Sequence, residues 1–185
     1  MGALHFNREI PGMIEPGEQD FLFELARDTY TGAGEIVEIG ALVGRSTCAL
    51  SRGLAISRAV EKERRIHVFD TFRFPAGRLE AVFRQTIGQA NGAGFRQAFD
   101  AYTRPWREYL DVHEGDARQA NWTRPIEILF IDCAAGLEFH REIARLFYPH
   151  VMAGGVIIHQ DWFYNRSWYL PGIMRSVEPE LVPIG

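Results

Sequence analysis

The sequence is poor in cysteine, in long apolar runs and in excess positive charge. Its 185 residues include two cysteines, Cys48 and Cys133, which lie far apart and each within an apolar stretch. Two such thiols are typical of buried free cysteines in a reducing compartment, and they exclude a disulfide-dense secreted scaffold. No apolar stretch approaches the roughly 18 to 20 residues that cross a bilayer, and the N-terminus has no apolar signal region. We therefore expect a cytoplasmic protein without a membrane segment.

Positively charged residues are not in excess over negatively charged ones either. The formal net charge is −4, and no run of basic residues interleaved with aromatic residues occurs. Nucleic acid is therefore not expected as a partner, because its recognition needs a cationic surface. What the chain has in quantity is apolar side chains, which make up 46% of the residues, and aromatic ones, which make up 12%. This composition predicts one well-packed domain that acts on a small molecule.

Short β-branched runs alternate with longer segments of helical periodicity. This alternation is typical of an α/β fold, in which helices cover both faces of a parallel sheet. The expected strands are Ile36 to Ile39, "RIHVFD" ending at Asp70, "LDVHEGD", "EILFID" and "GGVIIHQD". The expected helices are "EPGEQDFLFELARDTY" before the first strand, "STCALSRGLAISRAVEKE" after it and "LEFHREIARLFYPHVM" between the last two strands.

The whole chain, 1–185, is expected to form a single domain. Its core is expected over 35–70 and 110–161, with a helical N-terminal segment over 1–34 and an aromatic C-terminal segment over 162–185. The connection over 71–109 is longer than a crossover helix needs and is rich in aromatic residues. An ordered helical cap is therefore favoured there over disorder.

The stretch "IVEIGALVGRST" places a glycine turn directly after the first strand. Gly40 permits a tight bend, Gly44 lets the backbone approach either a ligand or a packed helix, and the next helix presents free N–H groups. Asp70 is placed either to accept hydrogen bonds from a ribose diol or to serve as a helix cap or as part of a solvated turn. The G-x-x-x-G spacing differs from the dinucleotide fingerprint, and Glu38 would repel a pyrophosphate. A cationic ligand with a ribose, such as S-adenosylmethionine, fits these residues better.

The stretch "VEIGALVGRSTCALSR" resembles the cofactor motif of class I S-adenosylmethionine-dependent methyltransferases, in particular the branch of catechol O-methyltransferase and the macrocin-type O-methyltransferases. The resemblance covers about Gly12 to Asp161 and continues through "HVFDTF", "HEGDA", "ILFID" and "PHVMAGGVIIHQDW". It implies a Rossmann-like fold, S-adenosylmethionine as cofactor and a small-molecule acceptor. Enzymes of this class normally add two strands after the fifth, so we expect an incomplete C-terminal hairpin here. An unpaired sheet edge would favour a homodimer.

The resemblance also implies a set of cofactor-binding residues. The set is Glu38, Gly40, Gly44, Ser46, Asp70, Gly115, Asp116 and Asp132. The first four would surround the methionine end, Asp70 would hold the ribose, the next two would lie at the adenine, and Asp132 would lie beside the reacting centre. For Ser46 the alternative is a simple N-cap, and for Asp116 it is a plain turn.

Methyl transfer requires an aligned acceptor and a group that takes up the acceptor's proton. Two arrangements remain open. In metal-dependent relatives oxygen ligands follow the fourth and fifth strands, and the matching residues here are Asp132, Gln160 and Asp161, which would suit Mg²⁺. Alternatively, His159 is a general base that Asp161 orients from the same face of the strand. The simpler interpretation of His159 is a hydrogen-bonded core residue.

Other side chains have less specific interpretations. His140 and His150 are predicted to lie on the surface. The aromatic residues near the C-terminus form either an acceptor wall or part of the core, and they are Trp162, Phe163, Tyr164, Trp168 and Tyr169.

The leading hypothesis is an O-methyltransferase for a small hydroxylated acceptor, such as a sugar or a natural product. One alternative is a module that binds S-adenosylmethionine without turnover, and another is a different enzyme on the same fold. A nicotinamide oxidoreductase is disfavoured by the glycine spacing and by Glu38.

Overall fold

The computed structural model describes residues 10–59, 61–63, 65–74, 78–88, 94–133, 135–160 and 169–177. Its strands are β1 Glu35–Ile39, β2 Ile66–Asp70, β3 Leu110–Glu114, β4 Ile126–Ile131 and β5 Val151–His159. They form one parallel sheet in the order β3-β2-β1-β4-β5, which confirms the predicted α/β fold. After β1, the chain adds β2 and β3 on one side of β1 and then crosses to the other side of β1 to add β4 and β5. In open parallel sheets, ligands bind beyond the carboxyl ends of the strands at such a point.

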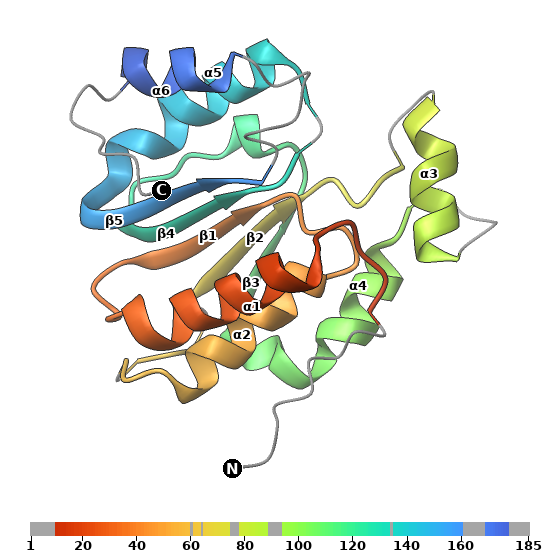
Figure 1. Cartoon of the computed structure of the whole chain (residues 1–185), viewed down its shortest axis with the longest axis horizontal. Helices are drawn as coiled ribbons and strands as arrows, with labels where there is room; N and C mark the ends of the chain where they lie inside the picture. The colour runs from red at the N-terminus through yellow and green to blue at the C-terminus, as the bar shows by residue number, and fades with distance from the viewer. Residues whose placement is uncertain are drawn as a thin grey trace.

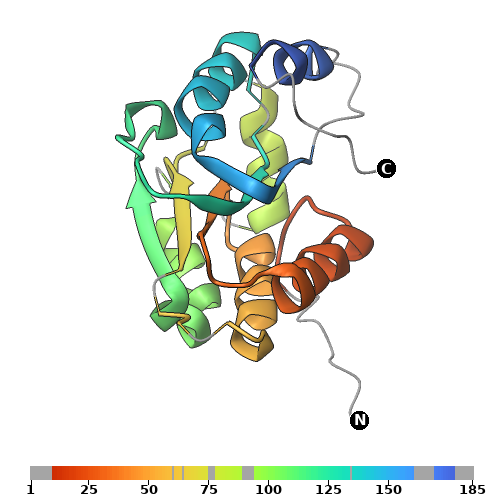
Figure 2. The same cartoon turned by 90° about the vertical axis from the view of Figure 1, so that its left-hand side faces the viewer.

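Helices cover both faces of the sheet (Figure 1). The α-helices are α1 Pro16–Glu24, α2 Arg45–Ile56, α3 Arg78–Ile87, α4 Arg96–Thr103, α5 Leu137–Phe147 and α6 Leu170–Val177. Figure 2 shows α5 and α6 on one side of the sheet and α1 and α2 on the other. Among the described residues, no helix combines the length and the apolar character that a membrane crossing requires.

Three helices differ from their predicted extents. The helix predicted between the last two strands ends at Phe147, and a 3-10 turn, Tyr148–His150, leads directly into β5. The first helix continues from α1 into a π-helical turn, Leu25–Thr29. The second, α2, ends at Ile56, several residues before the predicted end, because Ser57 turns the chain and its hydroxyl donates to the carbonyl of Leu54. No element was predicted for α6, in which Pro171 stands in the first turn and Ile173 is buried beside α5. Proline in a first turn and apolar residues at helical spacing explain this helix.

The strands contribute side chains to two separate apolar cores. Ile36, Val68 and Ile128 face α1, α2 and α4, whereas Val37 and Leu129 face α5. Every residue of β1 and β4 is buried, as expected for a sheet covered on both faces.

Most of the described residues of the connection over 71–109 are helical, and it has an isolated antiparallel bridge between Arg73 and Gly94. It contains α3, α4 and a 3-10 turn, Arg104–Tyr109. Phe72, Phe95 and Phe99 are buried in the core that α2 shares, so these aromatic rings stabilise the domain itself. The function of this segment as a cap over a ligand stays a prediction.

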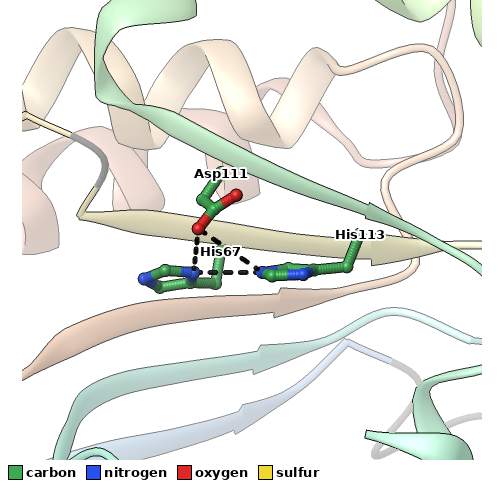
Figure 3. A group of neighbouring side chains, drawn as sticks. All are labelled: His67, Asp111 and His113. Carbon is green, nitrogen blue, oxygen red and sulfur yellow. Dashed lines mark hydrogen bonds and ion pairs between the residues drawn. The ribbon is translucent and has the colours of Figure 1, made fainter.

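On β2 and β3, the face of the sheet opposite to α2 carries polar side chains. The connection between β3 and β4 is described in full, and it forms a short 3-10 turn, Ala117–Gln119, in place of a crossover helix. His67, Asp111 and His113 lie together on this part of the sheet (Figure 3). The alternation of β-strand side chains places all three on the face that α5 covers farther along the sheet.

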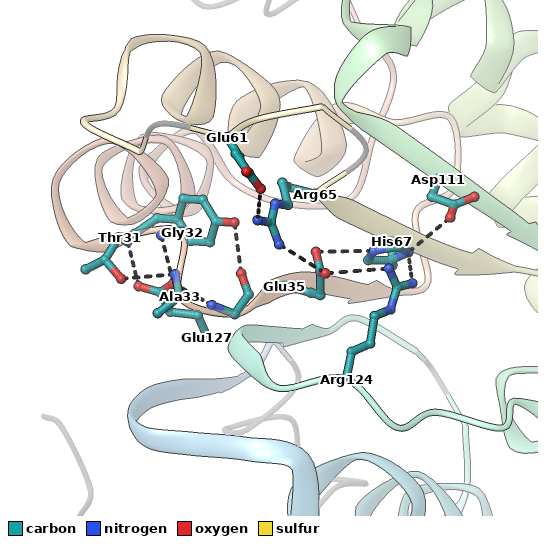
Figure 4. Close-up of polar contacts among 12 residues, drawn as sticks. Thr31, Gly32, Ala33, Glu35, Glu61, Arg65, His67, Asp111, Arg124 and Glu127 are labelled. Carbon is teal, nitrogen blue, oxygen red and sulfur yellow. Dashed lines mark hydrogen bonds and ion pairs between the residues drawn. The ribbon is translucent and has the colours of Figure 1, made fainter.

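A buried carboxylate ties the start of β4 to the turn before β1. Glu127 accepts backbone hydrogen bonds of 2.6 to 3.3 Å from four consecutive residues, Thr31, Gly32, Ala33 and Gly34 (Figure 4). Glu127→Ala is expected to lower the free energy of unfolding by about 3 kcal/mol, because the amides lose a charged acceptor. Urea unfolding measures this loss, with Glu138→Ala at an exposed site as control. Equal losses for the two variants would contradict the assignment.

Candidate cofactor site at the strand ends

Three carboxylates lie around the glycine turn. Glu38 belongs to β1, Asp70 ends β2, and Asp132 follows β4 directly, so all three come from neighbouring strands. The negative charges of Asp132 and Asp70 contribute to raising the pKa of Glu38. The fold thus concentrates negative charge at the carboxyl ends of three strands, where a cationic ligand would be stabilised.

Glu38 is fully buried beneath the first turn of α2. Its carboxylate accepts hydrogen bonds from the hydroxyls of Ser46 and Thr47, the latter at 2.6 Å. Burial raises the pKa of Glu38 to about 7, although these two hydrogen bonds oppose the shift. Thr47 was not predicted, and the signal for it is its place beside Ser46 in "GRST". Direct contact between Glu38 and a ligand stays a prediction.

Asp70 organises the turn after β1. Its Oδ2 accepts from the backbone N–H groups of Ala41 at 2.8 Å and Leu42 at 3.0 Å, and its Oδ1 accepts from Phe72 at 2.7 Å. Burial raises the pKa of Asp70 despite these three hydrogen bonds. A carboxylate has about four acceptor positions. Asp70 therefore holds the turn between β1 and α2 from a partly buried position, as neither a helix cap nor a solvated turn, and it keeps capacity for one hydroxyl donor, so the ribose role stays a prediction.

At both glycines of the turn, atoms of other elements lie too close for a side chain to fit. Gly40 has φ +87°, and a Cβ on it would lie 2.0 Å from the backbone oxygen of Asp132. Gly44 has φ +92°, and a Cβ on it would lie 2.5 Å from Cγ2 of Thr103 in α4. Of the two roles expected for Gly44, the structure therefore supports close packing against a helix, here α4. It is also the N-cap of α2 and has no side chain to cap the helix, so the first N–H groups of α2 remain available for an anionic group.

The other predicted cofactor residues flank this turn. Ser46 lies inside α2 with Gly44 as N-cap, so the N-cap alternative for Ser46 was wrong. Gly115 donates its N–H to the carbonyl of Asp70 at 2.9 Å, and a Cβ on Gly115 would have no neighbour within 4 Å in the described part of the chain. Asp116 caps the following 3-10 turn and pairs with Arg118 at 2.6 Å, which lowers the pKa of Asp116. Contact of these residues with a ligand stays a prediction.

His159, at the end of β5, is held by a neighbour. The hydroxyl of Tyr148 lies 2.5 Å from its Nε2. Burial lowers the pKa of His159 to about 3 and raises that of Tyr148, so the phenol keeps its proton and donates to a neutral imidazole. This arrangement favours the core interpretation over the general base. Asp161, the predicted orienting partner, lies outside the described residues, so the pair stays a prediction.

Gln160 and His140 also take positions that local sequence did not indicate. The Gln160 amide nitrogen donates to Glu18 in α1 at 3.4 Å. His140 is buried, and its Nδ1 lies 3.2 Å from the hydroxyl of Tyr169, so the predicted surface position of His140 was wrong. Its spacing of three and seven residues from Ile143 and Phe147 places it on the buried stripe of α5. His150 is partly exposed.

The parallel sheet with a glycine turn and acids at its carboxyl ends is the architecture of a class I methyltransferase. A family model of the methyltransferase domain matches residues 37–162. The chain belongs to this family and is an S-adenosylmethionine-dependent methyltransferase. A search of curated proteins finds no match to this chain.

Solved structures share the fold. Calicheamicin methyltransferase CalS11 has a TM-score of 0.60 and 21% identity, covering 86% of this chain and 68% of that one. The O-methyltransferase NovP has a TM-score of 0.59 and 16% identity, covering 83% and 68%. An S-adenosylmethionine-dependent O-methyltransferase from Thermotoga maritima has a TM-score of 0.61 and 11% identity, covering 92% and 53%. The chain therefore spans between about half and two thirds of the length of these proteins.

Proposed function

We propose that this methyltransferase transfers the methyl group of S-adenosylmethionine to a hydroxyl oxygen of a small acceptor, a sugar or a hydroxylated natural product. The observation that carries the cofactor assignment is the convergence of Glu38, Asp70 and Asp132 around a glycine turn. The oxygen acceptor is supported by the names of the structural relatives. CalS11 is described as a TDP-rhamnose 3'-O-methyltransferase and NovP as an O-methyltransferase.

S-adenosylmethionine supplies a methyl group on a positively charged sulfur. The residues of this chain bind and orient it. The first N–H groups of α2 receive the carboxylate of the methionine end, because the positive end of a helix favours an anion. Asp70 keeps the turn in place through Ala41 and Leu42 and uses its remaining acceptor position for a ribose hydroxyl. The negative charges of Glu38 and Asp132 balance the sulfonium.

The acceptor hydroxyl has to lose a proton during transfer. We assign that proton to the carboxylate of Asp132, which follows β4 beside the glycine turn. His159 is the alternative base, although Tyr148 occupies its Nε2. Mg²⁺ held by Asp132, Gln160 and Asp161 is the remaining alternative. Loss of turnover with EDTA and recovery with MgCl₂ would favour the metal over Asp132 acting alone.

The cofactor site is tested by calorimetry with S-adenosylhomocysteine. Asp70→Asn is expected to weaken binding by about 1 to 3 kcal/mol, or roughly 5- to 150-fold, because an amide cannot accept from all three backbone donors. Asp100→Asn, on an exposed part of α4, is the control and should bind like the wild type. Equal affinities of the wild type and both variants would show that Asp70 does not contribute to cofactor binding. A folded wild-type chain that does not bind would contradict the cofactor assignment.

Turnover separates the enzyme from a binding module. The wild-type chain is incubated with S-adenosylmethionine and a panel of sugar nucleotides, catechols and hydroxylated polyketides, and formation of S-adenosylhomocysteine is followed. Binding without acceptor-dependent turnover across the panel would favour the module, and a preference for NAD(H) would favour an oxidoreductase. A homodimer and a cytoplasmic location, both expected from the sequence, stay predictions.

A further inference from the structure

We propose that His67, Asp111 and His113 form a binding site for one divalent transition-metal ion of the zinc type. The three residues lie on β2 and β3, on the face of the sheet opposite to Glu38 and α2. The site shares no residue with the predicted cofactor set. Its ligand atoms are two imidazole nitrogens and one carboxylate oxygen, which suit zinc and its neighbours better than Mg²⁺.

The ligand atoms have the spacing of a tetrahedral site. His67 Nδ1 lies 3.1 Å from His113 Nε2 and 3.5 Å from Asp111 Oδ2, and the last two atoms are 4.0 Å apart (Figure 3). Tetrahedral zinc with bonds of about 2.0 to 2.1 Å holds its ligand atoms about 3.3 Å apart. The observed distances bracket this value, so small side-chain rotations suffice to coordinate an ion.

The register of the sheet produces this grouping. His67 pairs with Asp111 and Phe69 pairs with His113 across β2 and β3. Side chains at paired positions stand side by side on one face. Phe69 also stacks on the ring of His113, with centroids 4.4 Å apart, which restrains that ring.

The protonation pattern of His67 fits a metal ligand. Arg124 can only donate, and its Nη2 lies 3.1 Å from Nδ1 of His67, so Nδ1 is an acceptor and the ring proton is on Nε2. That Nε2 is fully buried and lies 3.4 Å from Oε2 of Glu35, and neither atom has a hydrogen-bond partner among the residues that the structure describes. Metal-bound histidines commonly donate their other ring N–H to a carboxylate. Glu35 is placed to be the carboxylate that accepts this N–H of His67 (Figure 4).

His113 is the second imidazole of the group, and a neutral imidazole is the form that binds a metal. The Nε2 of His113 lies 3.1 Å from Nδ1 of His67. When this Nε2 binds an ion, the proton of the neutral ring is on Nδ1 of His113.

A pocket of about 180 Å³ lies beside His113, lined also by Trp122, Thr123 and Arg124, and it offers space for a water molecule as a fourth ligand. Arg124 competes with the ion for Nδ1 of His67. Its side chain is 47% exposed, lies over the ring of Trp122 and pairs with Glu35 at 3.5 Å, so coordination requires the guanidinium to move away from His67.

The test is titration of the tag-free, metal-stripped chain with Zn²⁺, followed by calorimetry, and with Co²⁺, followed by visible absorption. The wild type is expected to bind about one equivalent and to give the intense absorption of tetrahedral cobalt. His113→Gln and Asp111→Asn, both at partly exposed positions, are expected to weaken zinc binding by at least about 100-fold. Glu35→Gln is expected to weaken it about 10- to 100-fold. Arg124→Gln is expected to strengthen it.

His150→Gln removes a partly exposed histidine outside the site and is the control, expected to bind like the wild type. Circular dichroism confirms that each variant is folded, and two independent ligand variants keep the test decisive if one of them is not. Failure of the wild type to bind zinc or to show the cobalt band overturns the proposal. Wild-type affinity in folded His113→Gln and Asp111→Asn overturns it equally.

Discussion

Gly40→Ala is expected to lower the free energy of unfolding by about 3 kcal/mol and to abolish binding of S-adenosylhomocysteine. Two costs add at this position. A residue with a Cβ is strained at φ +87°, which costs on the order of 1 to 2 kcal/mol, and the Cβ would lie 2.0 Å from the backbone oxygen of Asp132. Relief of that overlap requires β1 and β4 to separate at their carboxyl ends, where the cofactor is expected to bind.

Urea unfolding and calorimetry with S-adenosylhomocysteine measure both effects. Gly17→Ala is the matched control, because Gly17 is exposed in α1 and a Cβ there would contact none of the described residues. Alanine at that helical position is expected to be neutral or slightly stabilising. Wild-type stability and affinity in Gly40→Ala would show that the junction between β1 and β4 is not where the cofactor is held.

Glu38→Gln is expected to remove a component of the pH dependence of stability. The pKa of Glu38 is raised from 4.5 to about 7 in the folded chain, so the folded state holds this proton more tightly than the unfolded state. The resulting stabilisation is present below about pH 4.5, falls as the pH rises, and is lost above about pH 7. The shift corresponds to a loss on the order of 3 kcal/mol.

The measurement is the difference in free energy of unfolding between wild type and Glu38→Gln, from urea titrations between pH 4.5 and 8. The variant is expected to gain stability relative to the wild type as the pH rises. Glu127→Gln, at a buried carboxylate away from the glycine turn, is the control. A difference that does not change with pH would contradict the raised pKa of Glu38.

The same residue is expected to couple cofactor binding to pH. S-adenosylmethionine carries one more positive charge than S-adenosylhomocysteine, so its binding favours the ionised form of Glu38. Its affinity relative to S-adenosylhomocysteine should therefore rise with pH near 7, by up to about tenfold for each unit by which binding lowers the pKa. Glu38→Gln should abolish this rise.

The strands were predictable because their signal is local. A buried parallel strand needs a short β-branched run, and "EIVEI", "IHVFD" and "EILFI" each lie within such a run. Helix ends were less predictable, since α2 stops where Ser57 bonds back to Leu54, a contact that its periodicity does not reveal. The buried position of His140 became evident only once α5 was packed against the sheet and Tyr169.

The candidate site was predictable in its membership but not in its contacts. The resemblance to class I methyltransferases implied that Glu38, Asp70 and Asp132 belong together. It did not reveal that Ser46 and Thr47 both donate to Glu38, or that Asp70 binds the amides of Ala41 and Leu42. These contacts depend on the exact turn between β1 and α2, which the packing of Gly40 and Gly44 against other elements decides.

The sequence by itself determined the α/β class, the order of the strands along the chain and the acids at their ends, because hydrophobic period and turn residues act over a few positions. Only the tertiary structure decided which polar residues of different strands lie together on one face of the sheet. His67, Asp111 and His113 are separated by up to 46 residues and meet because β2 pairs with β3 in one register. A shift of one residue in that register would turn one strand's side chains to the opposite face. Such a pairing depends on the whole sheet and is not encoded in any single segment.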